Sequence, residues 1–107
     1  MILDKVNPND LYPTEKLGPS VLGTIEYEVQ GQRDFEGAYI ATNERLIMNV
    51  DMNGQFYYRS FPYAEIKGLS YEDGVLYITF EIGKIPMRDI QTEDVETFVQ
   101  YVQENLN

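Results

Sequence analysis

The dipeptide Asn53-Gly54 limits what this chain can fold into more than any other feature of its sequence. It separates two β-rich runs, and it suits a two-residue type I′ turn because both central residues of that turn need positive φ. Asp73-Gly74 separates two further β-rich runs in the same way. Two such turns predict that much of the chain forms consecutive antiparallel strands.

The expected strands are marked by alternating apolar and polar side chains. In the first of them, Ile25 and Tyr27 alternate with Glu26 and Glu28, which is typical of a half-buried strand. We expect the following stretch, residues 31–37, to be a loop. The predicted strands occupy residues 24–30, 38–41, 45–52, 55–61, 66–71 and 75–82, with a seventh around Ile85 and Met87. So many short strands in a small chain predict a closed or nearly closed antiparallel barrel or sandwich.

The beginning of the chain departs from this pattern. Pro8, Pro13 and Pro19 exclude a long helix there. We predict that residues 1–20 form an irregular arm and that residues 21–107 form the domain itself. The apolar side chains of the arm must cover either the domain's own sheet or a neighbouring subunit.

The end of the chain changes to helical periodicity. Apolar residues recur there at a spacing that gives one apolar stripe, which predicts an amphipathic helix that closes the domain. Thr92 is placed as its N-cap, and the acidic residues that follow suit the positive end of the helix dipole. The apolar residues are Val95, Phe98, Val99, Val102 and Leu106.

The composition argues against several classes of function. The chain has no cysteine and no histidine, which removes thiolate zinc sites, cysteine nucleophiles and the side chain most used as a general base or metal ligand. We therefore expect no enzyme, no metal and no cofactor, and no small-molecule substrate is evident. The net charge of −10 repels phosphate backbones, so we also expect no nucleic-acid partner.

Membrane insertion and export are disfavoured by the sequence as well. No apolar run approaches the ~20 residues of a membrane-spanning helix. Asp4 and Pro8 interrupt the region where a signal peptide needs an unbroken apolar stretch. The expected location is the cytoplasm, and the acidic charge disfavours binding to anionic lipid.

Two short motifs resemble a known family. Thr42-Asn43-Glu44-Arg45-Leu46 resembles the threonine, polar, polar, arginine, leucine signature that opens the third strand of bacterial pleckstrin-homology-like (PH-like) and GRAM-type domains. Phe61-Pro62-Tyr63-Ala64-Glu65-Ile66 is similar to their aromatic-rich approach to an isoleucine before the fifth strand. The resemblance covers about residues 21–106. It implies a seven-stranded, sharply bent antiparallel barrel, plugged at one end by the C-terminal helix and used as a binding or assembly platform.

Two features of this region have structural interpretations. Arg45 stands at a turn, so we expect it to hold the hairpin through a hydrogen bond or an ion pair with a nearby acid. Residues 51–54 share the first positions of a calcium loop, but the glutamate that such a loop needs downstream is missing. We therefore predict a hairpin turn at residues 51–54.

Lipid headgroup binding is one function that the resemblance suggests, through basic residues between the first two strands. Here Arg33 is offset by Asp34 and Glu36. Lys84 could join Arg33 at the open end of the barrel, with Asp51 nearby. A solvated polar loop is the favoured interpretation, and headgroup binding by Arg33 and Lys84 is the alternative function.

The aromatic residues suggest a protein interface. Because alternate residues of a strand face opposite sides, either Phe56 and Tyr58 or Tyr57, Arg59 and Phe61 must be partly exposed. Exposed aromatic side chains beside an arginine are typical of interfaces, unless the helix or the arm covers them. We predict a protein-interaction or self-assembly module that uses a strand edge, the aromatic face or the arm. The candidate residues are Phe56, Tyr57, Tyr58, Arg59, Phe61 and Tyr63.

Overall fold

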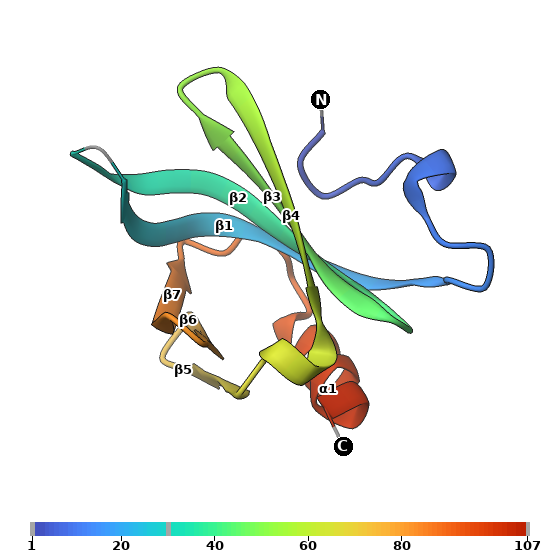
Figure 1. The fold of residues 1–107 in the computed structure, drawn as a ribbon. Helices are drawn as coiled ribbons and strands as arrows, with labels where there is room; N and C mark the ends of the chain where they lie inside the picture. The colour runs from blue at the N-terminus through green and yellow to red at the C-terminus, as the bar shows by residue number, and fades with distance from the viewer. Residues whose placement is uncertain (1, 30, 107) are drawn as a thin grey trace.

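Strands make up most of the molecule (Figure 1). The computed structural model describes residues 2–29 and 31–106. Its elements are η1 (Pro8–Asp10), β1 (Leu17–Val29), β2 (Gln32–Thr42), β3 (Arg45–Met52), β4 (Gln55–Pro62), η2 (Tyr63–Glu65), β5 (Gly68–Glu72), β6 (Val75–Phe80), β7 (Gly83–Arg88) and α1 (Val95–Leu106). The strands form an antiparallel sheet in the order β4-β3-β2-β1-β7-β6-β5. The predicted mainly β fold with one C-terminal helix is confirmed, but the sheet is bent and open rather than closed into a barrel.

Strand β1 makes the bend because it belongs to both halves of the sheet. It has 13 residues, pairs along much of its length with β2, and also pairs with β7 at Thr24–Arg88 and Ile25–Met87. The β5–β7 half therefore folds beneath the β1–β4 half (Figure 1). A Cβ atom at Gly23 would lie 2.8 Å from the carbonyl oxygen of Arg88, so glycine permits this close crossing.

Both predicted hairpin turns have the required backbone. Asn53 and Gly54 have φ of 56° and 86°, and Asp73 and Gly74 have φ of 52° and 80°. The Asp51 carboxylate accepts a hydrogen bond of 2.8 Å from the Gly54 N–H, which stabilises the first turn. The predictions of a hairpin at each dipeptide are confirmed.

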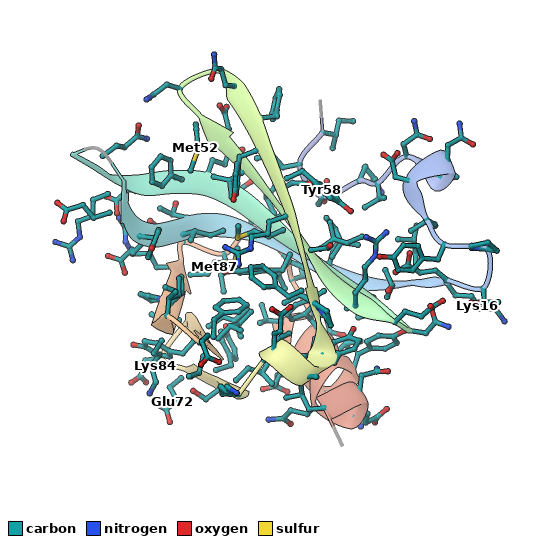
Figure 2. All side chains as sticks on the ribbon, viewed as in Figure 1. Lys16, Met52, Tyr58, Glu72, Lys84 and Met87 are labelled. Atoms are coloured by element: carbon teal, nitrogen blue, oxygen red, sulfur yellow. The ribbon has the colours of Figure 1, made fainter. Side chains whose placement is uncertain are left out.

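The helix fills one end of the concave side of the sheet. Val95, Phe98 and Val102 point inward and are almost completely buried. They belong to the same apolar cluster as Leu76 and Met87, and Met87 lies near the middle of the molecule (Figure 2). Helix α1 contacts β1 and β5, so it joins the two halves of the sheet.

The N-terminal arm packs on the other face of the sheet. Leu3 is buried in a second cluster with Ala38, Ile40 and Ile47. The sequence left open whether the arm covers the domain's own sheet or a neighbouring subunit. In the structure the arm covers the domain's own sheet. The arm enters the sheet earlier than expected, because β1 begins at Leu17 rather than at residue 24.

The predicted loop at residues 31–37 was wrong, because β2 occupies nearly all of it. Phe35 is buried between the exposed residues Asp34 and Glu36, which is the alternation of a strand with one solvent-facing side. The charged residues on either side of Phe35 made this segment resemble a loop in the sequence, although Phe35 points inward. Gln30, the last residue of the first predicted strand, lies outside the described residues.

The predicted N-cap was also wrong. Asp94, not Thr92, precedes the helix, and its Oδ1 atom accepts a hydrogen bond of 3.2 Å from the Thr97 N–H. The Thr97 hydroxyl donates to Asp94 Oδ2 at 2.5 Å. Thr92 instead accepts a hydrogen bond of 3.0 Å from the backbone N–H of Leu22, so it ties the segment before the helix to β1.

Candidate functional site

Strand β4 carries most of the aromatic residues predicted for an interface. Phe56, Tyr57 and Tyr58 are 46%, 42% and 45% exposed, so aromatic side chains on both faces of this strand reach solvent. Tyr58 lies on the side of β4 that faces the N-terminal arm (Figure 2). Phe61 is only 7% exposed, and its ring centroid lies 4.5 Å from that of Phe80 in the core.

The remaining two predicted interface residues differ in their surroundings. The Arg59 guanidinium lies 4.7 Å from the centroid of the Phe61 ring and is exposed. Tyr63 is half-buried, and its hydroxyl donates a hydrogen bond of 2.5 Å to the backbone oxygen of Thr42. Burial raises the pKa of Tyr63, with a smaller contribution from Tyr101. Within the described residues, Tyr63 is therefore held by a hydrogen bond, whereas the Arg59 side chain makes only its contact with the Phe61 ring.

A buried ion pair joins the arm to the turn between β2 and β3. Arg45 Nε and Nη2 donate to the two carboxylate oxygens of Glu15 at 2.9 and 3.1 Å, and the Thr42 hydroxyl lies 2.5 Å from Glu15 Oε2. The Arg45 guanidinium also lies 4.1 Å from the centroid of the Tyr12 ring and bonds the Tyr58 hydroxyl at 3.1 Å. Burial alone would raise the pKa of Glu15, but hydrogen bonds from Arg45 and Thr42 outweigh it and lower the pKa. Arg45 thus has a structural role, as expected, but its ion pair holds the arm to the turn, and only its bond to Tyr58 lies within the β3–β4 hairpin.

The rest of the same turn is bonded to the arm as well. Asn43 Oδ1 accepts a hydrogen bond of 2.6 Å from the Lys16 N–H, and the Thr14 hydroxyl donates to Glu44 Oε2 at 2.9 Å. Through these hydrogen bonds, polar residues of the motif at residues 42–46 hold the arm in place. The motif at residues 42–46 therefore marks the fold rather than a ligand site.

The two cations considered for headgroup binding do come together. Arg33 and Lys84 line one shallow depression of about 340 Å³, as expected. Glu26 and Glu28 line it too, so the site places two carboxylates beside two cations. Asp51 is not among the lining residues and instead stabilises the β3–β4 turn.

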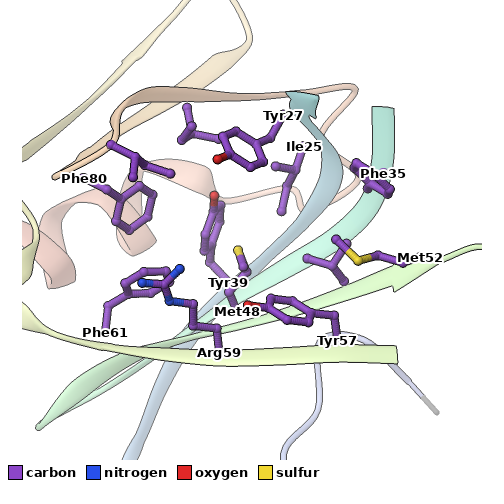
Figure 3. Close-up of a pocket in the computed structure, with 13 residues that line it drawn as sticks. Ile25, Tyr27, Phe35, Tyr39, Met48, Met52, Tyr57, Arg59, Phe61 and Phe80 are labelled. Carbon is purple, nitrogen blue, oxygen red and sulfur yellow. The ribbon is translucent and has the colours of Figure 1, made fainter. Parts of the chain in front are cut away.

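A second, mainly apolar pocket, which shares the lining residues Tyr27 and Ile85 with this depression, opens on the concave side of the sheet, away from α1 (Figure 3). Its volume is about 350 Å³, within the range of about 300–1,000 Å³ found for ligand sites. Its 13 lining residues come from β1, β2, β3, β4, β6, β7 and the turn before β7. The sequence analysis did not predict this pocket, because no single motif contains residues from so many strands.

The Tyr39 hydroxyl is the most unusual polar group of the pocket. The residue is 1% exposed, and no residue in the described part of the chain hydrogen-bonds its hydroxyl. Figure 3 shows the hydroxyl pointing into the space bordered by Tyr27 and Phe80. Burial raises the pKa of Tyr39 well above its ordinary value. An unpaired buried hydroxyl costs about 1–3 kcal/mol, so its position requires an explanation.

A family comparison agrees with this architecture. A family model described as "Bacterial PH domain" matches residues 11–104, nearly the whole chain. The chain belongs to the bacterial PH domain family. This confirms the resemblance noted in the motifs at residues 42–46 and 61–66.

Further comparisons support the fold of this PH domain. The C-terminal domain of an unknown protein from Leishmania infantum has a similar structure, with a TM-score of 0.61 over 87% of this chain and 86% of that chain. At 16% sequence identity, this likeness concerns the fold alone. No curated protein sequence gives a significant match.

The described residues of this PH domain contain neither a helix suited to span a membrane nor a group of side chains suited to hold a metal ion. Within residues 2–29 and 31–106, no helix has the length and apolar character needed to cross a membrane. In the same ranges, no three acidic side chains gather in a way that could hold a metal ion.

Proposed function

We propose that this PH domain is a non-enzymatic module that acts through protein contact, and that its partner is a second copy of the chain bound along β4. The observation that carries the proposal is the exposure of Phe56, Tyr57 and Tyr58 on a strand at the edge of the sheet. An edge strand offers a row of backbone N–H and C=O groups that another strand can pair with. Aromatic side chains add the apolar contact area that such pairing needs.

The charge of β4 favours pairing with itself. Although the chain has a net charge of −10, the only charged residue of β4 is Arg59. In an antiparallel pair centred on Tyr57, Phe56 of each copy would face Tyr58 of the other, and Arg59 would face Gln55. No like charges would stand opposite each other in this register, and the aromatic pair would stabilise it.

Sedimentation velocity of the full chain at high micromolar concentration tests the proposal. We expect a dimer, and we expect the double substitution Phe56→Lys with Tyr58→Lys to make it monomeric, because lysines would then face each other across the two copies. The matched control, Ile2→Lys with Leu17→Lys, makes the same change at two exposed apolar residues outside β4 and should leave the dimer intact. A monomeric wild type, or a dimer that survives the β4 double substitution, would contradict the proposal.

Headgroup binding through Arg33 and Lys84 is the second candidate. The observation in its favour is that both cations line one depression, and the observation against it is that Glu26 and Glu28 line it too. Flotation with anionic vesicles at low salt, where screening is weakest, is the test. Retention of the wild type on vesicles, lost in the Arg33→Gln Lys84→Gln variant, would favour this function over self-association.

A further inference from the structure

The pocket on the concave side combines an apolar wall with two polar groups, the Tyr39 hydroxyl and the Arg59 guanidinium, to which the described residues give no hydrogen bond or ion pair. Its apolar wall includes Phe35, Met48 and Val50. Arg59 is the only charged side chain among its described lining residues. The Tyr39 hydroxyl is the buried polar group that points into it. A site of this kind fits a molecule with an apolar body and a small number of fixed polar atoms.

Arg59 indicates the charge of that molecule. The chain has 18 acidic and 8 basic residues, yet no carboxylate of residues 2–29 or 31–106 forms an ion pair with Arg59. Its guanidinium stacks on the Phe61 ring, which orients its N–H groups at the edge of the apolar space. A planar guanidinium pairs well with a carboxylate because two parallel hydrogen bonds can form. The ligand is therefore expected to be an acid rather than a neutral or basic molecule.

Tyr39 indicates a second polar atom on the ligand. A phenol hydroxyl both donates and accepts hydrogen bonds, so it can pair with a hydroxyl or keto oxygen. Because Tyr39 is almost completely buried, this oxygen must enter the pocket with the apolar part of the ligand. A purely apolar chain would leave the hydroxyl unpaired.

We propose that the pocket binds a medium-chain hydroxy or keto carboxylic acid. The carboxylate pairs with Arg59, the oxygen substituent bonds the Tyr39 hydroxyl, and the hydrocarbon chain lies against the apolar wall. The pocket shares strand β4 with the proposed pairing, since Tyr57, Arg59 and Phe61 line it. It uses side chains on the concave side of β4, whereas Tyr58 lies on the side that faces the arm.

Titration of the full ¹⁵N-labelled chain by NMR, with octanol, octanoate and β-hydroxyoctanoate as probes, tests each polar contact separately. We expect octanoate to bind about tenfold more tightly than octanol, and β-hydroxyoctanoate about fivefold more tightly than octanoate. Arg59→Gln should remove the preference for octanoate over octanol. Arg33→Gln, which removes the same charge outside the pocket, should preserve it.

Tyr39→Phe should remove the advantage of β-hydroxyoctanoate while leaving the binding of octanoate unchanged. Circular dichroism of each variant confirms that it is folded, so a loss of preference is not a loss of structure. The proposal is overturned if no probe shifts the amide signals of the pocket strands at millimolar concentration. It is also overturned if Arg59→Gln keeps the preference for the acid, or if Tyr39→Phe keeps the preference for the hydroxyl derivative.

Discussion

The two ends of the concave face share strands but are filled differently. At the helix end, Phe98 and Val102 of α1 are completely buried and pack in one cluster with Val21 of β1. At the hairpin end, Ile25 and Tyr27 of the same strand line a pocket of about 350 Å³. The helix end is closed because α1 supplies apolar side chains to it, and none of the residues described in α1 lines the pocket. In this bent sheet, α1 fills one end of the concave face and leaves the pocket at the other end.

Truncation at the two ends should have very different costs. Phe98→Ala removes a completely buried ring and should lower the free energy of unfolding by about 3–5 kcal/mol, because it leaves a cavity in a packed region. Met52→Ala at the pocket removes a partly exposed side chain beside existing space and should cost about 1 kcal/mol. Urea unfolding followed by circular dichroism measures both. Equal costs at the two ends would contradict the comparison.

The arm contributes to the helix end through the Arg45–Glu15 pair. Gly18, just after the arm, lies against the Tyr101 ring of α1, and Leu17 pairs with Thr42 beside this ion pair. Arg45→Met should lower the free energy of unfolding by about 3 kcal/mol, because it leaves the Glu15 carboxylate buried without its cation. The double variant Arg45→Met with Glu15→Gln should recover part of this loss in the same urea experiment. A double variant no more stable than Arg45→Met would show that packing, rather than an unpaired charge, causes the loss.

The same pair should make stability depend on pH. The folded-state pKa of Glu15 lies below its ordinary value of 4.5, so its stabilising contribution is present above that value and is lost as the pH falls through the folded pKa. Thermal melts across this acidic range should show a steeper loss of Tm for the wild type than for Arg45→Met with Glu15→Gln. Parallel pH profiles for the two proteins would argue against this role of Glu15.

The sequence predicted features that lie within one segment better than features that join distant segments, for a physical reason. The spacing of Val95, Phe98 and Val102 is a local pattern, and so are the turns at Asn53-Gly54 and Asp73-Gly74. Each can be recognised within one segment, and the structure confirms them. The strand predicted at residues 38–41 lies within β2, but the first part of β2 was missed because charged residues surround its one buried aromatic residue in the 31–37 stretch.

The pocket and the ion pair depend on contacts between distant segments. Glu15 is an ordinary acid in a proline-containing arm, and nothing beside it in the sequence points to Arg45, which is 30 residues away. Tyr39 lies in the predicted strand at residues 38–41, but the lack of a hydrogen-bond partner among the described residues depends on strands from across the sheet. The pattern of residues within one segment does not show which distant residues will contact it in the folded protein.

The smallest expected change in the free energy of unfolding comes from a substitution at the pocket, and it is an increase rather than a decrease. Tyr39→Phe removes a buried hydroxyl that has no partner among the described residues, so it should raise the free energy of unfolding by about 1 kcal/mol in the absence of ligand. Tyr63→Phe is the matched control at the helix end. Its hydroxyl bonds the Thr42 oxygen, and its loss should destabilise the protein by about 1 kcal/mol. Urea unfolding of the two variants should move in opposite directions, because one hydroxyl is satisfied within the packed end and the other is held unsatisfied at the open end. If both substitutions destabilise the protein, the Tyr39 hydroxyl has a hydrogen-bond partner in solution. The pocket end would then differ less from the packed helix end than the structure indicates.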